Sequence, residues 1–246
     1  MNNKRLFAKG KRGVVFLERK FCRKLIVKEK NPDAGIDTLK NEAEFLKILN
    51  KHNIGPKFHS FNGKELRMEF IDGERILDFI GKNNKNSLLG AIPGLKAQGI
   101  CAPRLKANFW NSKFRPEDRG IHHPPKISPE VEVSYKKEKI KKVLLDVLDQ
   151  MFVMDSLGIN KFEMTSPKKH VIVRRGRPVL IDFERCRRSE KPKNVTQFVH
   201  FMTSRKMKEP LEEKGIALDR ERLIMLAAKY KKEMTKEHFE MIKAEV

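Results

Sequence analysis

Two short apolar runs separated by a glycine place the strongest constraint on how this chain can fold. They cover residues 170–174 and 178–182, are rich in β-branched side chains, and are joined by an Arg-Gly-Arg sequence. Glycine is common in the tight turns of β-hairpins. The pattern therefore predicts a hairpin with Glu163 in the loop before its first strand and Asp182 at the end of its second strand.

The segment before this loop is the clearest helix in the sequence. Apolar residues recur at three- and four-residue steps between Glu138 and Leu157, and Gly158 follows. Such a stripe is typical of a helix that faces a core. We expect it to be the central helix of the C-terminal part. Further helices are expected around it at 194–207, 219–234 and from 235 onwards.

The N-terminal part begins with a glycine pair and two extended runs. Gly10 and Gly13 precede the first run, and Lys28 ends the second. Taken alone, an ordinary hairpin explains the glycines and a solvated surface explains the lysine. Two more strands and a short helix are expected at 56–61, 66–70 and 74–80.

A helix is expected between the run that ends at Lys28 and the strand predicted at 56–61. Asp37 is a suitable N-cap, and apolar residues recur on one face until Gly55 and Pro56 end the pattern. The helix carries two acidic residues, Glu42 and Glu44. The glycine turn, the strand-ending lysine and the acidic helix form an ordered series, which carries more information than any of the three alone.

Residues 83–134 differ in kind from the rest of the chain. They hold six prolines, four glycines and the only tryptophan, without helical or alternating periodicity. We expect an irregular insertion. Its segment 108–115 mixes aromatic and cationic side chains, which either stack on nucleic-acid bases or anchor the segment on the protein's own surface. His122 and His123 lack carboxylates or cysteines at metal-ligand spacing.

The formal net charge of +22 is the strongest compositional signal. It favours attraction to polyanions, and hence an RNA or ribonucleoprotein partner. A solvated basic surface, including the charge-rich surface of a heat-adapted protein, explains it equally well.

Cysteine usage and hydropathy exclude several classes. The three cysteines are scattered, without a Cys-x-x-Cys pair, which argues against a disulfide framework and a zinc knuckle. No apolar run reaches about 18 residues, and no signal core follows the basic first residues. We therefore expect a cytoplasmic protein without a membrane partner.

The order of these features resembles that of protein kinases, which place two functional carboxylates on either side of such a hairpin. Glu163 and Asp182 are 19 residues apart, close to the spacing in the small atypical Ser/Thr protein kinases of archaea. Residues 53–58 also look like the helix-to-strand passage of those proteins, which are related to the RIO kinases and to the kinase subunit of the KEOPS complex. The resemblance covers about 5–82 and 136–200.

The resemblance implies an α+β, two-lobed protein-kinase-like fold. A small, mostly β N-lobe with one helix would cover 1–72, and a larger helical C-lobe with a catalytic hairpin would start at 73–82, after the hinge. It would continue at 135–246, beyond the insertion 83–134. Backbone groups of Glu69 and Ile71 in the hinge would contact adenine.

The resemblance also implies ATP and Mg²⁺ as cofactors. Gly10 and Gly13 would let the backbone approach the triphosphate, and Lys28 would clamp its phosphates. Glu42 would hold Lys28, with Glu44 as the competing candidate.

The catalytic loop departs from the kinase pattern. Glu163 stands in place of the catalytic Asp, after Lys161 and Phe162, and would orient or deprotonate an acceptor hydroxyl. Lys168 stands where kinases have a metal-binding Asn and would neutralise the γ-phosphoryl group. His170 would replace that Asn as a magnesium ligand.

Asp182 keeps the metal-binding carboxylate of the Asp-Phe-Gly motif, although Glu184 replaces the glycine. The sequence therefore predicts an ATP-dependent atypical Ser/Thr protein kinase that phosphorylates a protein not identifiable from the sequence. One alternative is a nucleotide-binding pseudokinase that acts as an RNA- or ribosome-associated module. The other is a small-molecule phosphotransferase of the same superfamily.

Overall fold

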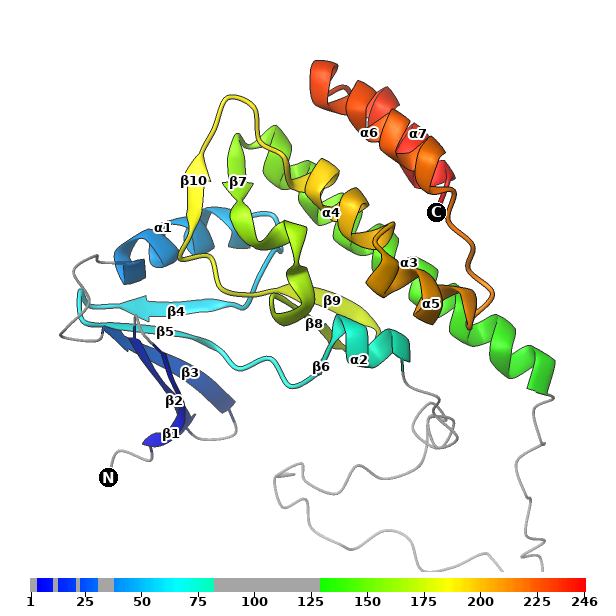
Figure 1. The fold of residues 1–246 in the computed structure, drawn as a ribbon. Helices are drawn as coiled ribbons and strands as arrows, with labels where there is room; N and C mark the ends of the chain where they lie inside the picture. The colour runs from blue at the N-terminus through cyan, green and yellow to red at the C-terminus, as the bar shows by residue number, and fades with distance from the viewer. Residues whose placement is uncertain (1–3, 11–12, 21–22, 31–37, 82–128) are drawn as a thin grey trace, which may run out of the picture.

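The described part of the chain, in a computed structural model, comprises residues 4–10, 13–20, 23–30, 38–81 and 129–246. A sheet-containing lobe built from its N-terminal part lies against a larger helical lobe (Figure 1). The α+β, two-lobed architecture that the resemblance implied is confirmed. The aromatic segment 108–115 and most of the predicted insertion lie outside the described residues.

The N-terminal lobe is a five-stranded antiparallel sheet with one helix. The strands are β1 (Lys4–Lys9), β2 (Gly13–Lys20), β3 (Arg23–Lys30), β4 (Phe58–Phe61) and β5 (Glu65–Glu69), in the order β1-β2-β3-β5-β4. Helix α1 (Thr38–Asn50) packs on β3, β4 and β5. Its predicted apolar face is buried, which removes several leucines from water and stabilises the lobe by about 1.5–3 kcal/mol for each.

The connection between the lobes is held by close backbone contact. β6 (Glu74–Arg75) pairs with the first strand of the predicted hairpin, and α2 (Ile76–Gly81) follows. A Cβ atom at Gly73 would lie 2.5 Å from the carbonyl oxygen of Val173. The helix predicted at 74–80 begins two residues later, at Ile76, because Glu74 and Arg75 are extended and pair with the hairpin strand.

The predicted hairpin is confirmed. β8 (Val171–Arg174) pairs with β9 (Arg177–Leu180), and Arg175 and Gly176 both have positive φ in the turn. A shorter pair was not predicted: β7 (Ile159–Lys161) pairs with β10 (Cys186–Arg188). Two 3-10 turns lie between β7 and the hairpin, η3 (Phe162–Thr165) and η4 (Pro167–Lys169).

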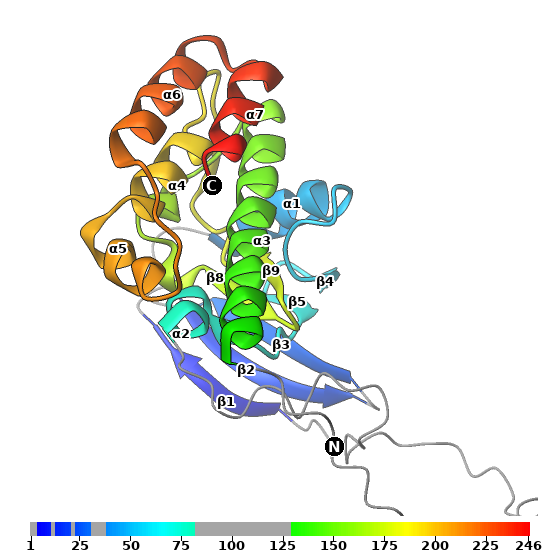
Figure 2. The same cartoon turned by 90° about the vertical axis from the view of Figure 1, so that its right-hand side faces the viewer.

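The C-terminal lobe is organised around α3 (Pro129–Ser156), as predicted (Figure 2). The helix begins at Pro129 rather than at Glu138, so the prediction that residues 129–134 are irregular was wrong. The helices α4 (Asn194–Met202), α5 (Arg205–Glu212), α6 (Arg220–Glu233) and α7 (Lys236–Ala244) follow. The helix predicted at 194–207 is thus two helices, with a break after Met202. None of the described helices is long and apolar enough to cross a membrane.

Candidate active site

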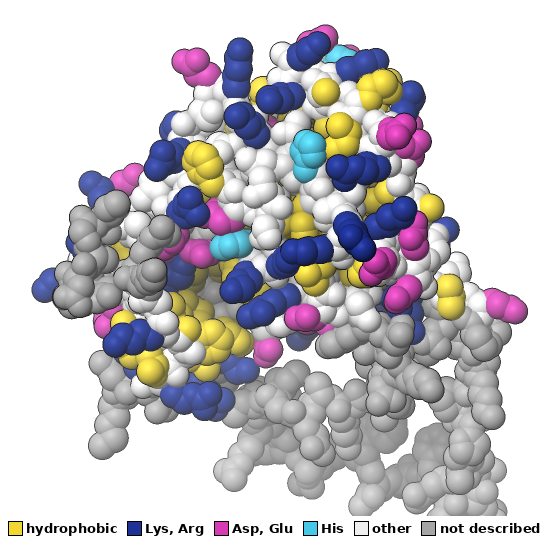
Figure 3. All heavy atoms as spheres, viewed as in Figure 1, with side chains coloured by type: hydrophobic (Ala, Val, Ile, Leu, Met, Phe, Trp, Pro, Cys, Tyr) yellow, Lys and Arg dark blue, Asp and Glu magenta, His cyan; other side chains and the backbone are white. Residues whose placement is uncertain are grey.

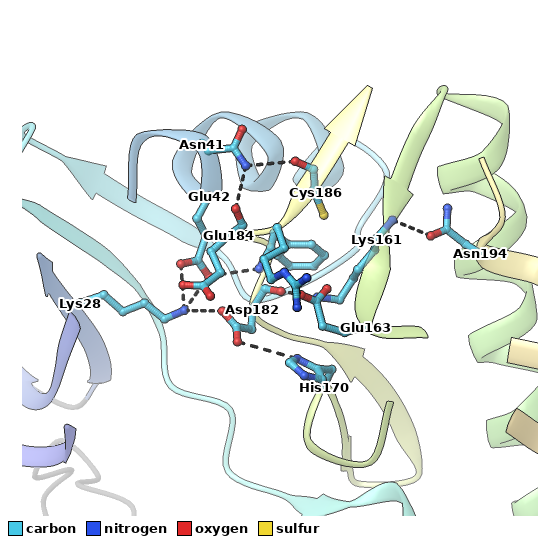
Figure 4. Close-up of polar contacts among 12 residues, drawn as sticks. Lys28, Asn41, Glu42, Lys161, Glu163, His170, Asp182, Glu184, Cys186 and Asn194 are labelled. Atoms are coloured by element: carbon cyan, nitrogen blue, oxygen red, sulfur yellow. Dashed lines mark hydrogen bonds and ion pairs between the residues drawn. The ribbon is translucent and has the colours of Figure 1, made fainter. Parts of the chain in front are cut away.

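Lys28 on β3 forms the centre of the site (Figure 4). Its ammonium lies 2.7 Å and 2.8 Å from the two carboxylate oxygens of Glu42 on α1, whose side chain is 1% exposed. Glu44 is exposed instead. The structure therefore gives Glu42 as the partner of Lys28, a choice that the sequence left open.

Asp182 shares the same ammonium. Its Oδ1 lies 3.1 Å from the Lys28 Nζ, so one cation holds carboxylates from α1 and from the end of the hairpin. Burial acts to lower the pKa of Lys28, but Glu42 and Asp182 outweigh it and raise this pKa. Burial acts to raise the pKa of Asp182, and the ammonium groups of Lys28 and Lys161 outweigh it and lower this pKa. Both groups are therefore charged at neutral pH.

The backbone of Asp182 is constrained as well. Its φ is +66°, a left-handed conformation that costs a non-glycine residue of order 1 kcal/mol. The next residue, Phe183, is buried and donates its N–H to the Glu42 carboxylate at 3.2 Å. A Cβ atom at Gly55 would lie 2.7 Å from the Phe183 ring. The packing of this ring, together with the hydrogen bond, offsets the strain and fixes the direction of the Asp182 side chain.

Asn41 adds a second connection between the lobes. Its side-chain amide donates to the carbonyl oxygens of Glu184 at 2.9 Å and Cys186 at 3.0 Å. Helix α1 thus holds the segment after Asp182 through two neighbouring residues, Asn41 and Glu42.

Lys161 has no role predicted from the sequence, but the structure buries it beside both carboxylate-bearing segments. Its side chain is fully buried and donates to the backbone carbonyl of Asp182. The ammonium also lies 3.3 Å from Glu163 Oε2 and 5.1 Å from the centre of the Phe183 ring. Lys161 therefore joins the two carboxylate-bearing segments. The sequence signal for it is only a lysine two residues before the acidic loop residue Glu163.

Glu163 lies in η3, with its side chain 10% exposed. Its other carboxylate oxygen lies 3.6 Å from the Arg185 Nε. Figure 4 shows Glu163 and Lys28 on either side of Asp182. The predicted pair of carboxylates is thus brought together through Lys161 rather than by direct contact.

His170 faces the other oxygen of Asp182. Its Nδ1 lies 3.7 Å from Asp182 Oδ2, and this nitrogen is buried without a hydrogen-bond partner. Burial, with the nearby Lys161, lowers the pKa of His170, so the ring is neutral. An unsatisfied imidazole nitrogen beside a carboxylate fits a cation or a water held between them.

The Asp182 carboxylate fits a magnesium ion, which prefers oxygen ligands, whereas the His170 nitrogen suits a water bound to such an ion rather than the ion itself. Mg²⁺ keeps several waters and commonly uses only one or two protein ligands together with substrate phosphates. In the described ranges, no group of three or more His, Cys, Asp or Glu residues could hold a metal ion. A site in which Asp182 would be the only protein ligand among the described residues is consistent with both facts.

A cavity of about 450 Å³ opens beside Lys28 and Asp182. It is also lined by Gly10 and Gly13 at the turn between β1 and β2, and by the start of α1. A Cβ atom at Gly13 would lie 2.6 Å from the Glu29 carbonyl oxygen, so only glycine fits there. The predicted glycine turn, lysine and metal-binding carboxylate therefore face one cavity.

The predicted hinge residues do not line this cavity. The carboxylate of Glu69 lies 2.6 Å from Arg174 Nη1, and the Glu69 N–H donates to the Lys57 carbonyl. Ile71 is buried. Glu69 is the last residue of β5, and Ile71 lies in the segment that leads from β5 to β6.

Lys168 also lies away from the cavity. It belongs to η4, and its ammonium lies beside that of Lys206 on α5, which lowers the pKa of Lys168. Lys168 contacts neither Lys28 nor Asp182, so the structure gives no support to the prediction that it binds the γ-phosphoryl group.

Below the loop, Asn194 at the start of α4 is fully buried and holds β7. Its side-chain oxygen accepts a hydrogen bond from the Lys161 N–H at 2.7 Å, and its amide donates to Asp155 Oδ1 at 2.7 Å. Asp155 also accepts from the Tyr230 hydroxyl and the Val195 N–H. This buried network connects α3, α4 and α6 to the loop that carries Glu163.

No family model matches the sequence, and neither does any curated protein. Among solved structures, the chain is similar to the kinase PK-1 of Cydia pomonella granulovirus, with 14% identity over 78% of this chain and 57% of that chain, and a TM-score of 0.45. It is also similar to the autoinhibited serine kinase domain of the giant muscle protein titin, with 16% identity over 76% of this chain and 46% of that chain, and a TM-score of 0.43.

The chain thus spans about half the length of these two structures. Neither structure is described as a RIO or KEOPS-complex kinase, so that finer resemblance remains a prediction.

Proposed function

We propose that this protein is an ATP-dependent protein kinase that transfers the γ-phosphoryl group to a serine or threonine hydroxyl. One observation carries the proposal: the ammonium of Lys28 lies between the carboxylates of Glu42 and Asp182, at the wall of a cavity that Gly10 and Gly13 also line. Phosphoryl transfer depends on positioned charge around the triphosphate more than on covalent chemistry by the protein. The arrangement provides such positioned charge.

Each group has a defined role in this proposal. Lys28, oriented by Glu42, contacts the phosphates, and the backbone at Gly13 approaches them without steric clash. Asp182 would hold magnesium, and His170 would hold a water bound to the ion. When bound, the ion neutralises charge on the phosphate oxygens. ATP and Mg²⁺ are therefore the expected cofactors.

On the acceptor side, Glu163 orients the hydroxyl and accepts its proton. The hydroxyl oxygen forms the new bond to the γ-phosphorus, the bond from this phosphorus to the bridging oxygen breaks, and ADP leaves with the electron pair. Lys161 holds Glu163 at a fixed position relative to Asp182, because it contacts both residues.

A second candidate is a nucleotide-binding module without turnover that associates with RNA. Two observations favour it. Lys28 contacts Asp182 directly, where a metal ion would otherwise bind, and the net charge is +22. A small-molecule phosphotransferase is the third candidate, and it differs from the first only in the acceptor.

The test combines nucleotide binding with turnover. Purified protein is titrated with MgATP, and phosphate transfer from labelled ATP is followed with protein, peptide and small-molecule acceptors. We expect saturable binding and transfer to protein that are lost in Lys28→Ala and in Asp182→Ala. Normal turnover in either variant would refute the assignment. Magnesium-independent binding without turnover would favour the second candidate, and transfer confined to small molecules would favour the third.

A further inference from the structure

Four cations of the C-terminal lobe form what we call the basic patch: Lys168, Lys169, Arg205 and Lys206. None of the four pairs with a carboxylate within the residues that the structure describes. The side chains of Lys168 and Lys206 reach each other from η4 and from the first turn of α5. By contrast, Lys208 on the same helix lies 3.8 Å from Glu212.

The basic patch adjoins the acceptor side of the proposed site. η4 follows η3, the turn that carries Glu163, and it directly precedes His170. Helix α2 contacts both η4 and α5, which keeps these two elements together. Figure 3 shows Lys and Arg side chains gathered over this face of the C-terminal lobe.

The geometry decides what kind of anion fits. Two ammonium groups that approach each other repel unless an anion lies between them. Their convergence on one point suits a compact group such as a carboxylate, which accepts strong hydrogen bonds from both. A nucleic-acid strand instead presents phosphates spaced along its length, and it is usually bound by a stripe of cations.

We propose that the basic patch docks acidic side chains of the acceptor protein, so that the kinase prefers serine or threonine residues flanked by Asp or Glu. This inference rests on the proposed function and names its substrate class. Contact between acceptor carboxylates and the lysine pair would bring the adjacent hydroxyl to Glu163. Lys169, Arg205 and Lys206 are solvent-exposed, so docking is strongest at low salt.

Binding of labelled peptides tests the proposal without requiring turnover. The probe is a fluorescent peptide with a central serine flanked by Asp and Glu, and its matched counterpart carries Asn and Gln. By fluorescence anisotropy at low salt, we expect Lys206→Glu to weaken binding of the acidic peptide at least fivefold. Lys208→Glu makes the same charge change on the same helix, and we expect less than a twofold effect. Thermal unfolding verifies that both variants are folded.

Three outcomes would overturn the inference. One is equal weakening by both variants, which would mean that only net charge matters. Another is equal wild-type affinity for the acidic and the neutral peptide. The third is a loss of binding to a short RNA oligonucleotide in Lys206→Glu while acidic-peptide binding is unchanged, which would assign the basic patch to RNA. If the acidic peptide binds in a Lys206-dependent way but the protein does not turn over ATP, the proposed function is refuted and the docking role of the basic patch stands.

Discussion

The two sides of Asp182 are built in opposite ways. On the side of the proposed nucleotide cavity, Lys28 is held by two carboxylates, and Glu42 is almost completely buried. On the proposed acceptor side, Lys168 and the exposed Lys206 lie near each other without a carboxylate partner among the described residues. The charge of Lys28 is thus balanced by carboxylates of the same chain. The charges of Lys168 and Lys206 can still pair with an anion on another molecule.

This difference matches what each side would have to do. A triphosphate is the same in every reaction cycle, so its contacts gain from groups that are already fixed in position. A protein acceptor must arrive and leave, and exposed charges speed its association without holding it tightly. Lys161 lies between the two sides, and variants of the three regions can separate their contributions.

The largest effect is expected for Lys28→Met. Removing the shared ammonium leaves a buried carboxylate without its cation, which costs about 3–5 kcal/mol in the free energy of unfolding. ATP turnover should fall by at least about 100-fold. Lys24→Met is the matched control on the same strand, because Lys24 pairs with the exposed Asp72 at 3.3 Å and should cost less than about 1 kcal/mol. Similar losses of stability and turnover in both variants would contradict the conclusion that Glu42 and Asp182 depend on the ammonium of Lys28.

Lys161→Met should affect the acceptor side more than the nucleotide side. The substitution leaves Glu163 and the Asp182 carbonyl without their buried donor, and we expect a loss of about 3 kcal/mol in unfolding free energy. Phosphate transfer should fall at least about 10-fold, with a smaller change in the Kd for MgATP, measured by titration calorimetry. A large loss of MgATP affinity with normal transfer would show that Lys161 does not position Glu163.

The support of the acceptor loop should depend on pH. Burial raises the pKa of Asp155 from 3.8 to about 6. Because the folded state favours the protonated form, the contribution of this group to stability is complete below pH 4 and is lost as the pH rises through 6. The difference corresponds to about 3 kcal/mol. The free energy of unfolding, measured with denaturant, should fall between pH 4 and pH 7 in the wild-type protein but not in Asp155→Asn. An equal fall in both proteins would contradict the role of Asp155.

The smallest effect is expected for Asn41→Ala. The variant loses two hydrogen bonds to the segment after Asp182, which should cost about 1–2 kcal/mol in unfolding free energy. Glu44→Gln is the control on the same helix, because Glu44 is exposed and should change stability by less than about 0.5 kcal/mol. Equal thermal unfolding of the two variants would mean that α1 does not hold that segment.

The features predicted from the sequence are those with a local cause. The hairpin followed from two β-branched runs and a glycine, and the core helix α3 followed from its apolar stripe. The order of Gly13, Lys28 and an acidic helix pointed to three groups that the structure places together. In each case the pattern lies within one element, or in the order of neighbouring elements.

The features that were missed depend on contacts between distant segments. The pairing of β7 with β10 and the burial of Lys161 both arise because residues more than 20 positions apart lie side by side. The break between α4 and α5 occurs where Thr203 is buried and accepts a hydrogen bond from Arg220 at its carbonyl. No local periodicity carries such information.

By itself, the sequence determined the hairpin, the main helices and the residue types available to bind a triphosphate, because periodicity and turn chemistry act over short stretches of chain. The two-lobed architecture was expected only from the resemblance to protein kinases. Tertiary structure decided that Glu42 rather than Glu44 meets Lys28, and that a buried lysine links the two carboxylate-bearing segments. It also decided that Lys28 pairs with carboxylates of the chain, whereas Lys168 and Lys206 have no carboxylate partner among the described residues. The reason is physical: the strength of a charge depends on its burial and on its neighbours, and both are set only when the chain has folded.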